Sequence, residues 1–432
     1  MTFILYFGIT NLLYFLPADL IRITGLLPEV TPSMNKLMFL VMIGALAMWL
    51  GYWSPIAARV TFWGSLVRFR SRYFKFGREP KSWVLPVLVL ISLISRLTQV
   101  RLGVFGYSSS YERLLEAASY TQYLYLGSLL GTLSLVVAAF QYYSPNRSRG
   151  AIIWFFGIFI IELIFGFLLG FKTAVVMPFI IVLLCQYMRT GRLSRYFLIA
   201  IPLSLVIAFA VIEPFRYAKT EEEKLGVEFN STSLTNIAKT LSGTTPAALY
   251  AASKTATKEQ ASLLVSIMAR ANLTYTGAVG IQYADDNENL PEGSPEFLDT
   301  IIYAPFYAWI PRFLWESKPV WDIGVWYTRT VMGYGHNGAT AMGLFTYLYF
   351  AGGVIVVFGS LFFIGFMQRV IFFFTHPWKS DAGAIVFMGM LSSTVMIAEG
   401  AFNGVMVSFF RDFPLILILT AFCYARIRII LR

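Results

Sequence analysis

Long apolar runs separated by short polar turns occupy most of the chain, and this pattern predicts a bundle of membrane-spanning helices. A run of roughly 20 apolar residues is what an α-helix needs to cross the hydrocarbon core of a bilayer. About ten runs qualify, so we expect an all-α, polytopic membrane helix bundle. The expected spans are residues 2–16, 37–55, 82–96, 120–140, 150–168, 173–189, 196–213, 342–367, 383–400 and 412–427.

The spans divide the chain into three parts. We expect membrane helices 1 to 7 in residues 1–213, one large outer segment in residues 214–341, and membrane helices 8 to 10 in residues 342–432. The first apolar run has no basic leader and no small-residue cleavage site after it, so it is expected to be a membrane helix and not a signal peptide.

The long outer segment has the composition of an ordinary soluble region. Within it, Thr257 and Gln260 form a capping-box pattern, followed by apolar residues at helical spacing, so an amphipathic helix carrying Arg270 is expected there. A shorter helix is expected over roughly residues 232–252. No internal repeat is visible in the sequence.

Composition and charge agree with a membrane protein and suggest its orientation. Of all residues 57% are hydrophobic and 13% are charged, and the mean hydropathy is +0.66. The net charge of +11 comes mainly from Lys and Arg that gather in every second loop, most densely between residues 56 and 81. Such loops stay in the cytoplasm, so both termini are expected to be cytoplasmic and no nucleic-acid partner is expected.

The ligands for a metal or a disulfide framework are sparse. Cys185 and Cys423 lie within apolar runs, and the two histidines, His336 and His376, are far apart in sequence. We therefore expect no metal site and no cofactor.

Several cations fall on the expected outer face, against the usual bias, so each needs an explanation. Arginine forks pair bidentately with phosphate, which makes a pyrophosphate their natural ligand. The alternatives are contact with lipid headgroups for Lys172 and Arg270, and a local ion pair with Glu213 for Arg216. The candidate pyrophosphate ligands are Lys172, Arg216, Arg270 and Arg312.

The stretch "APFYAWIPRFLWESKPVWDIG", residues 304–324, contains six aromatic residues and three prolines. It is too interrupted for a spanning helix and too apolar for an ordinary loop. Aromatic faces suit both sugar rings and the membrane interface. The candidate sugar-binding residues here are Trp315, Lys318 and Trp321.

Two tracts resemble the bacterial O-antigen and oligosaccharide repeat-unit polymerases of the Wzy type. "GFLLGFKTAVVMPFIIVLLCQYMRTGR" is similar to the short outer turn, next helix and basic inner loop of that family, with Lys172 at its basic position. "IPRFLWESKP", followed by "GLFTYLYFAGGVIVVFGSLFFIGFMQR", is similar to its passage from the large outer loop into the next span. The resemblance covers roughly residues 150–370. The basic position of the family element is an arginine or a lysine, and in this chain it is a lysine, Lys172.

The resemblance implies a metal-independent glycosyltransferase with the GT-C membrane fold in the bacterial inner membrane. It implies transfer, at the periplasmic face, of a glycan from undecaprenyl diphosphate to the terminal sugar of another lipid-linked repeat unit. The implied partners are the lipid-linked donor and acceptor, membrane lipids and a chain-length regulator protein.

Such a transfer also needs a group that accepts or orients the proton of the acceptor hydroxyl. The preferred candidates are His336 in "GYGHNGAT" and Glu399 near the outer end of the ninth expected span. Asp322 is a further candidate, whereas Glu162 lies deeper, where a structural hydrogen bond or protonation is the simpler expectation.

The sequence leaves three rival functions open. An O-antigen ligase would use the same donor but transfer the glycan to lipid A core. A transporter of lipid-linked glycans would need charged or broken helices near the midplane, and repeat symmetry. A membrane scaffold would bind a periplasmic partner through residues 214–341.

Overall fold

The described part of the chain is helical apart from one short strand pair. The structure is a computed structural model that describes residues 31–61, 75–76, 83–106, 117–145, 147–204, 206–208, 212, 273–287, 290–310, 314–315, 318, 323–333, 340–375, 377, 381–390 and 401–426. The strand pair joins β1 (Lys75–Phe76) to β2 (Ala425–Arg426) in antiparallel register, with Lys75 opposite Arg426.

Seven helices in these residues are long and apolar enough to cross a membrane. This confirms the prediction of a helical membrane protein, while the count of about ten spans and the GT-C-like arrangement stay predictions. The candidate spans are Pro32–Thr61, Val84–Leu102, Tyr120–Tyr142, Arg149–Leu169, Thr173–Thr190, Leu344–Phe373 and Phe402–Tyr424.

The remaining expected spans have different outcomes. Within the expected span 196–213, the described residues include the apolar helix Arg195–Ala208, and part of that span lies outside the described residues. The last span begins at Phe402 and not at 412. The expected first span, the expected helices at 232–252 and after Thr257, and most of the ninth span lie outside the described residues.

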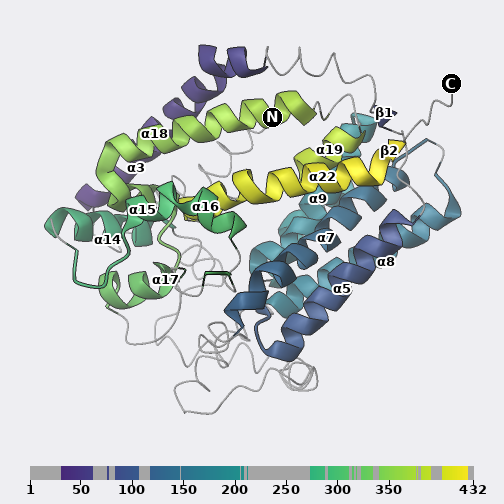
Figure 1. Cartoon of the computed structure of the whole chain (residues 1–432), viewed down its shortest axis with the longest axis horizontal. Helices are drawn as coiled ribbons and strands as arrows, with labels where there is room; N and C mark the ends of the chain where they lie inside the picture. Colours follow the sequence, from purple (N-terminus) through teal and green to yellow (C-terminus); the bar gives the residue numbers. More distant parts are fainter. Residues whose placement is uncertain are drawn as a thin grey trace. The chain divides into compact units, whose positions relative to one another are not determined.

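The chain divides into two compact units that cut across the three-part division expected from the sequence. Unit 1 comprises Met1–Phe76, Ser262–His376 and Met390–Arg432, and unit 2 comprises Gly77–Ala261 and Pro377–Gly389. Figure 1 shows the helices of both units.

Unit 2 is built around one central helix. Helix α7 (Ala118–Tyr142) packs against α5 (Val84–Leu102), α8 (Arg149–Leu169), α9 (Lys172–Thr190) and α19 (Asp381–Gly389). Helix α8 ends at Leu169, the next residue, Gly170, has a left-handed φ of 74°, and α9 begins at Lys172. A Cβ at Gly166 would lie 2.6 Å from the carbonyl oxygen of Ala174. The expected very short turn is therefore confirmed, and its glycines permit the sharp reversal and the close helix approach.

Unit 1 is organised by two long helices, α3 (Thr31–Trp53) and α18 (Leu344–Thr375), which lie side by side (Figure 1). Near their N-termini the Lys36 ammonium lies 4.6 Å from the centre of the Tyr349 ring. Near their C-termini Arg369 donates a 2.9 Å hydrogen bond to the carbonyl oxygen of Tyr52. The two helices therefore run parallel.

Glycines set the distance between these helices. A Cβ at Gly51 would lie 2.0 Å from the carbonyl oxygen of Phe362, and a Cβ at Gly365 would lie 1.9 Å from that of Met48. Helix α18 is also broken near its N-terminus, where Gly352 and Gly353 have non-helical backbone angles. The helix thus has a short N-terminal piece and a long piece that follows α3.

Short helices of the expected outer segment pack on the N-terminal piece of α18 and on the last span. They are α14 (Leu273–Asp286), α15 (Phe297–Ile302), α16 (Ala304–Trp309), α17 (Ile323–Trp326) and the π-helix η5 (Tyr327–Val331). The last span consists of α21 (Phe402–Val407), the π-helix η7 (Ser408–Asp412) and α22 (Phe413–Tyr424). An ion pair of 2.7 Å between Lys36 and Asp285 ties α14 to α3.

Candidate functional site

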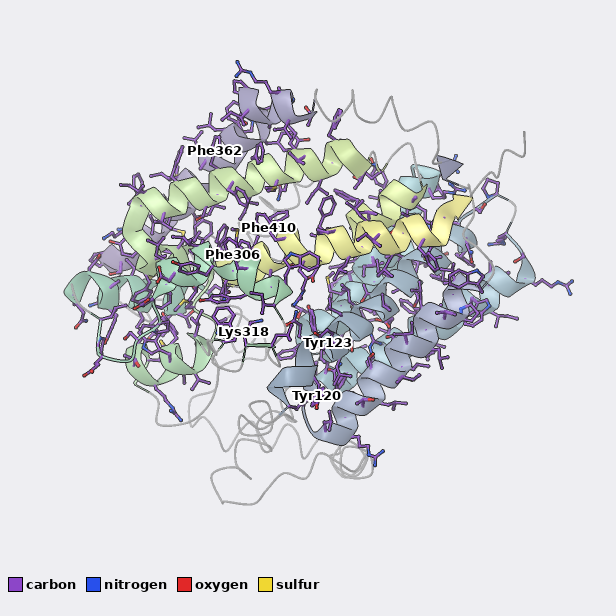
Figure 2. All side chains as sticks on the ribbon, in the orientation of Figure 1. Tyr120, Tyr123, Phe306, Lys318, Phe362 and Phe410 are labelled. Atoms are coloured by element: carbon purple, nitrogen blue, oxygen red, sulfur yellow. The ribbon has the colours of Figure 1, made fainter. Side chains whose placement is uncertain are left out.

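The aromatic stretch found in the sequence forms an exposed apolar edge on unit 1. Pro305 lies in the first turn of α16, where its missing N–H costs nothing, so the helix can begin there. Ala304 and Ala308 are buried, whereas Tyr303, Phe306 and Trp309 are exposed. Figure 2 shows Phe306 on this helix. Helix α16 thus turns its small side chains inward and its aromatic side chains outward.

Lys318 folds back onto the end of α16. Its ammonium donates hydrogen bonds to the carbonyl oxygens of Tyr307 and Ile310, the latter at 2.9 Å. These carbonyls belong to the last turn of the helix, where a cation is stabilised by unpaired carbonyl groups and the helix dipole. Trp315 lies beside the same turn, with its ring centre 5.1 Å from that of Tyr307. The Lys318 ammonium therefore helps to hold the C-terminal end of α16 in place.

A pair of carboxyl groups lies at the start of α15. Asp299 is in the first turn of the helix, and Glu296 immediately precedes the helix. A side-chain hydrogen bond with Asp299, together with the charge of that group, raises the pKa of Glu296 above its ordinary value. Burial raises the pKa of Tyr307, and Tyr303 and Asp299 raise it further. The face made by α15 and α16 thus combines aromatic rings with acidic groups.

Aromatic side chains from α15, α17 and the N-terminal piece of α18 pack against one another. The ring of Phe297 stacks on that of Phe350 at 5.1 Å and meets Trp326 edge-on at 5.3 Å. The buried hydroxyls of Thr300 and Tyr347 share a hydrogen bond. Close packing of this kind locks rotamers, so α15 is held rigidly against the short N-terminal piece of α18.

The loop that contains His336 is closed at its base. Thr328, in η5, donates a 2.8 Å hydrogen bond from Oγ1 to the Oγ1 of Thr340 and accepts one of 2.8 Å from the backbone N–H of Thr340. His336 itself lies outside the described residues. The base of its loop is thus fixed to the same set of outer helices.

The last span carries a buried ion pair that the sequence interpretation missed. Arg411 and Asp412 lie in η7, with 9% and 7% of their surface exposed. The Arg411 Nε donates to Asp412 Oδ1 at 2.8 Å, and the Ser408 hydroxyl donates to Asp412 Oδ2 at 3.2 Å. Helix α16 packs against both α21 and η7. The signal in the sequence was "SFFRDFP", two opposite charges inside an apolar run, which is a functional hypothesis by default in a membrane helix.

Glu162 makes structural hydrogen bonds, one of the two outcomes expected for it. Its carboxylate accepts 2.6 Å and 3.0 Å hydrogen bonds from the two terminal nitrogens of Arg96, within unit 2. Both residues are buried. The negative charge of the buried Glu162 carboxylate is thus neutralised by a bidentate pairing with Arg96.

Of the predicted site residues, the structure brings Trp315 and Lys318 together at the end of α16. Lys172 is the first residue of α9, and only its backbone is described. The roles assigned to these residues stay predictions. The predicted residues outside the described part are Arg216, Arg270, Arg312, Trp321, Asp322, His336 and Glu399.

In the described part of the chain, no group of three or more potential metal ligands comes together. No protein-family model matches the chain, and no curated protein or solved structure matches it either. The resemblance to the Wzy-type polymerases is therefore carried by the quoted sequence tracts alone.

Proposed function

We propose that the protein is a membrane glycosyltransferase that polymerises lipid-diphosphate-linked oligosaccharide repeat units at the outer face of the membrane. The observation that carries the proposal is the α15–α16 face, where exposed aromatic rings and a pair of carboxyl groups lie directly on membrane-spanning helices. A lipid-linked glycan presents sugar rings, a diphosphate and an apolar tail at a membrane interface, where aromatic side chains are favoured.

The proposed transfer joins two lipid-linked units. A hydroxyl oxygen of the acceptor sugar attacks the anomeric carbon of the donor, and the bond between that carbon and the diphosphate oxygen breaks. The hydroxyl proton passes to a base, for which His336 and Glu399 are the proposed candidates. The lipid diphosphate leaves with the bonding electrons, and Arg216, Arg270, Arg312 and Lys172 are proposed to stabilise its charge.

A transporter of lipid-linked glycans is the second candidate, and two observations favour it. Helix α18 is discontinuous at Gly352 and Gly353, and the last span contains a π-helix with a buried ion pair. Broken helices and buried charges are features of transporter binding sites. The absence of an internal repeat in the sequence weighs against this function.

The test is an assay with purified protein in detergent or nanodiscs and a lipid-diphosphate repeat unit, without divalent metal. A polymerase should give a ladder of longer glycans, and Arg312→Ala should abolish the ladder while leaving membrane insertion unchanged. Normal ladders from Arg312→Ala would remove that residue from the proposed site. Transfer to added lipid A core alone would identify a ligase, and movement of the lipid across vesicles without any transfer would identify a transporter.

A further inference from the structure

Two buried arginines in the membrane spans differ in how their hydrogen-bond donors are used. Arg96, in α5, directs Nη1 and Nη2 at the Glu162 carboxylate, and Nη2 also donates to the carbonyl oxygen of Ser128 at 3.2 Å. Its terminal nitrogens are thus occupied by protein groups. This is the expected state of a structural arginine in a membrane bundle.

Arg411 uses a different edge of its guanidinium group. Its Nε donates a hydrogen bond to Asp412 Oδ1. In the described part of the chain the guanidinium group makes no other hydrogen bond. Arginine has five N–H donors, four of them on the two Nη atoms. The side chain keeps 11% of its surface exposed. The two Nη atoms therefore carry donors that make no hydrogen bond with the described residues.

The backbone that carries Arg411 has an unusual conformation for a membrane span. Residues 408–412 form a π-helix, a rare conformation that frequently lies at functional sites. The neighbouring Phe410 stacks on Phe363 of α18, with 6.4 Å between ring centres. Helix α16, an element of the expected outer segment, also packs against η7.

We propose that the Nη edge of Arg411 binds phosphate oxygens of a lipid, with Asp412 and Ser408 holding the guanidinium plane. This rests on the proposed function in naming the diphosphate of the lipid-linked substrate as the source of those oxygens. A guanidinium group pairs bidentately with phosphate, keeps its charge at any physiological pH, and is more easily desolvated than an ammonium group. Asp412 neutralises the group when the site is empty, which explains how the arginine remains buried.

The proposal is tested by ligand-dependent thermal unfolding of the full chain in detergent. The probes are undecaprenyl diphosphate, undecaprenol, inorganic pyrophosphate and phosphatidylglycerol. Undecaprenyl diphosphate should raise the Tm of the wild type, whereas undecaprenol should not. Arg411→Lys keeps the charge but loses the planar fork, so its apparent Kd for the diphosphate should rise by roughly tenfold or more.

Arg96→Lys is the matched control, because it changes a buried arginine whose terminal nitrogens are already occupied. It should lower the Tm without ligand and leave the apparent Kd unchanged. An unchanged Kd in Arg411→Lys, or an equal rise in both variants, would overturn the proposal. An Arg411-dependent Tm shift with phosphatidylglycerol and none with undecaprenyl diphosphate would support the phosphate site and assign it to a phospholipid headgroup.

The two proposals fail separately. Arg411-dependent binding of the diphosphate by a wild-type protein that forms no glycan ladder would refute the polymerase and keep the site. A normal ladder with the same diphosphate affinity in wild type and Arg411→Lys would refute the site and keep the polymerase.

Discussion

Arg96 and Glu162 show how single residues make a buried charge tolerable in an apolar bundle. Removing two charges from water is costly, and their attraction offsets that cost only with good geometry and further hydrogen bonds. The pair is bidentate, and the carbonyl oxygen of Ser128 accepts one more hydrogen bond from Arg96. Room for it comes from Gly131, where a Cβ would lie 2.4 Å from Glu162 Oε1. The pair thus depends on both partners being present.

We expect Arg96→Leu and Glu162→Leu each to reduce the free energy of unfolding by about 3–5 kcal/mol, because each leaves an unpaired buried charge. The double variant should lose much less than the sum of the two, since it leaves no charge behind. Thermal or denaturant unfolding of the three variants in detergent measures this coupling. Strictly additive losses would show that the two groups do not act as a pair.

At the scale of elements, glycines decide how closely α3 and α18 approach. Within a membrane, helices associate through close packing and not through a hydrophobic driving force, so small residues gather at the contact. Gly51 and Gly365 each face a backbone carbonyl of the other helix. Because α14 is attached to the same pair of helices, their separation also sets the position of the outer segment.

Gly51→Ala and Gly365→Ala are expected to reduce the free energy of unfolding by about 1–3 kcal/mol, because the added methyl group meets rigid backbone. Gly359→Ala is the matched control on α18, since its Cβ would meet no atom within 4 Å. That change should be neutral or stabilising by up to about 1 kcal/mol through helix propensity. Thermal unfolding in detergent compares the three, and equal effects would contradict the contact.

The elements themselves were largely predictable, and the polar contacts were not. Hydropathy located the long spans because bilayer thickness fixes their length. It placed the start of the last span at 412, whereas the candidate span begins at Phe402 and includes the charged pair Arg411 and Asp412. The pairing of Arg96 with Glu162 joins helices far apart in sequence, which one sequence without tertiary contacts does not reveal.

For the whole molecule, the parallel packing of α3 and α18 constrains the path of the chain through the membrane. Four candidate spans lie between them in sequence, from Val84–Leu102 to Thr173–Thr190. With four crossings between them, α3 and α18 would run in opposite directions through the membrane. We therefore expect a fifth crossing between them. The apolar helix Arg195–Ala208 is the described element that fits, as the sequence interpretation expected.

We therefore expect residues 193 and 292 to lie on opposite sides of the membrane. Leu193→Cys and Glu292→Cys, both at exposed positions, can be introduced after Cys185 and Cys423 are replaced by alanine. In intact spheroplasts a membrane-impermeant maleimide should label the cysteine at 292 and should label that at 193 only after lysis. Labelling of both before lysis would show that the chain does not cross between them.

The two-residue strand pair limits the number of membrane crossings between its strands. Segments that share backbone hydrogen bonds lie in one compartment, so we expect the chain to cross the bilayer an even number of times between Phe76 and Ala425. Six of the seven candidate spans lie in that interval, and Arg195–Ala208 would make seven. We then expect an eighth crossing, and the ninth expected span, residues 383–400, is our candidate for it.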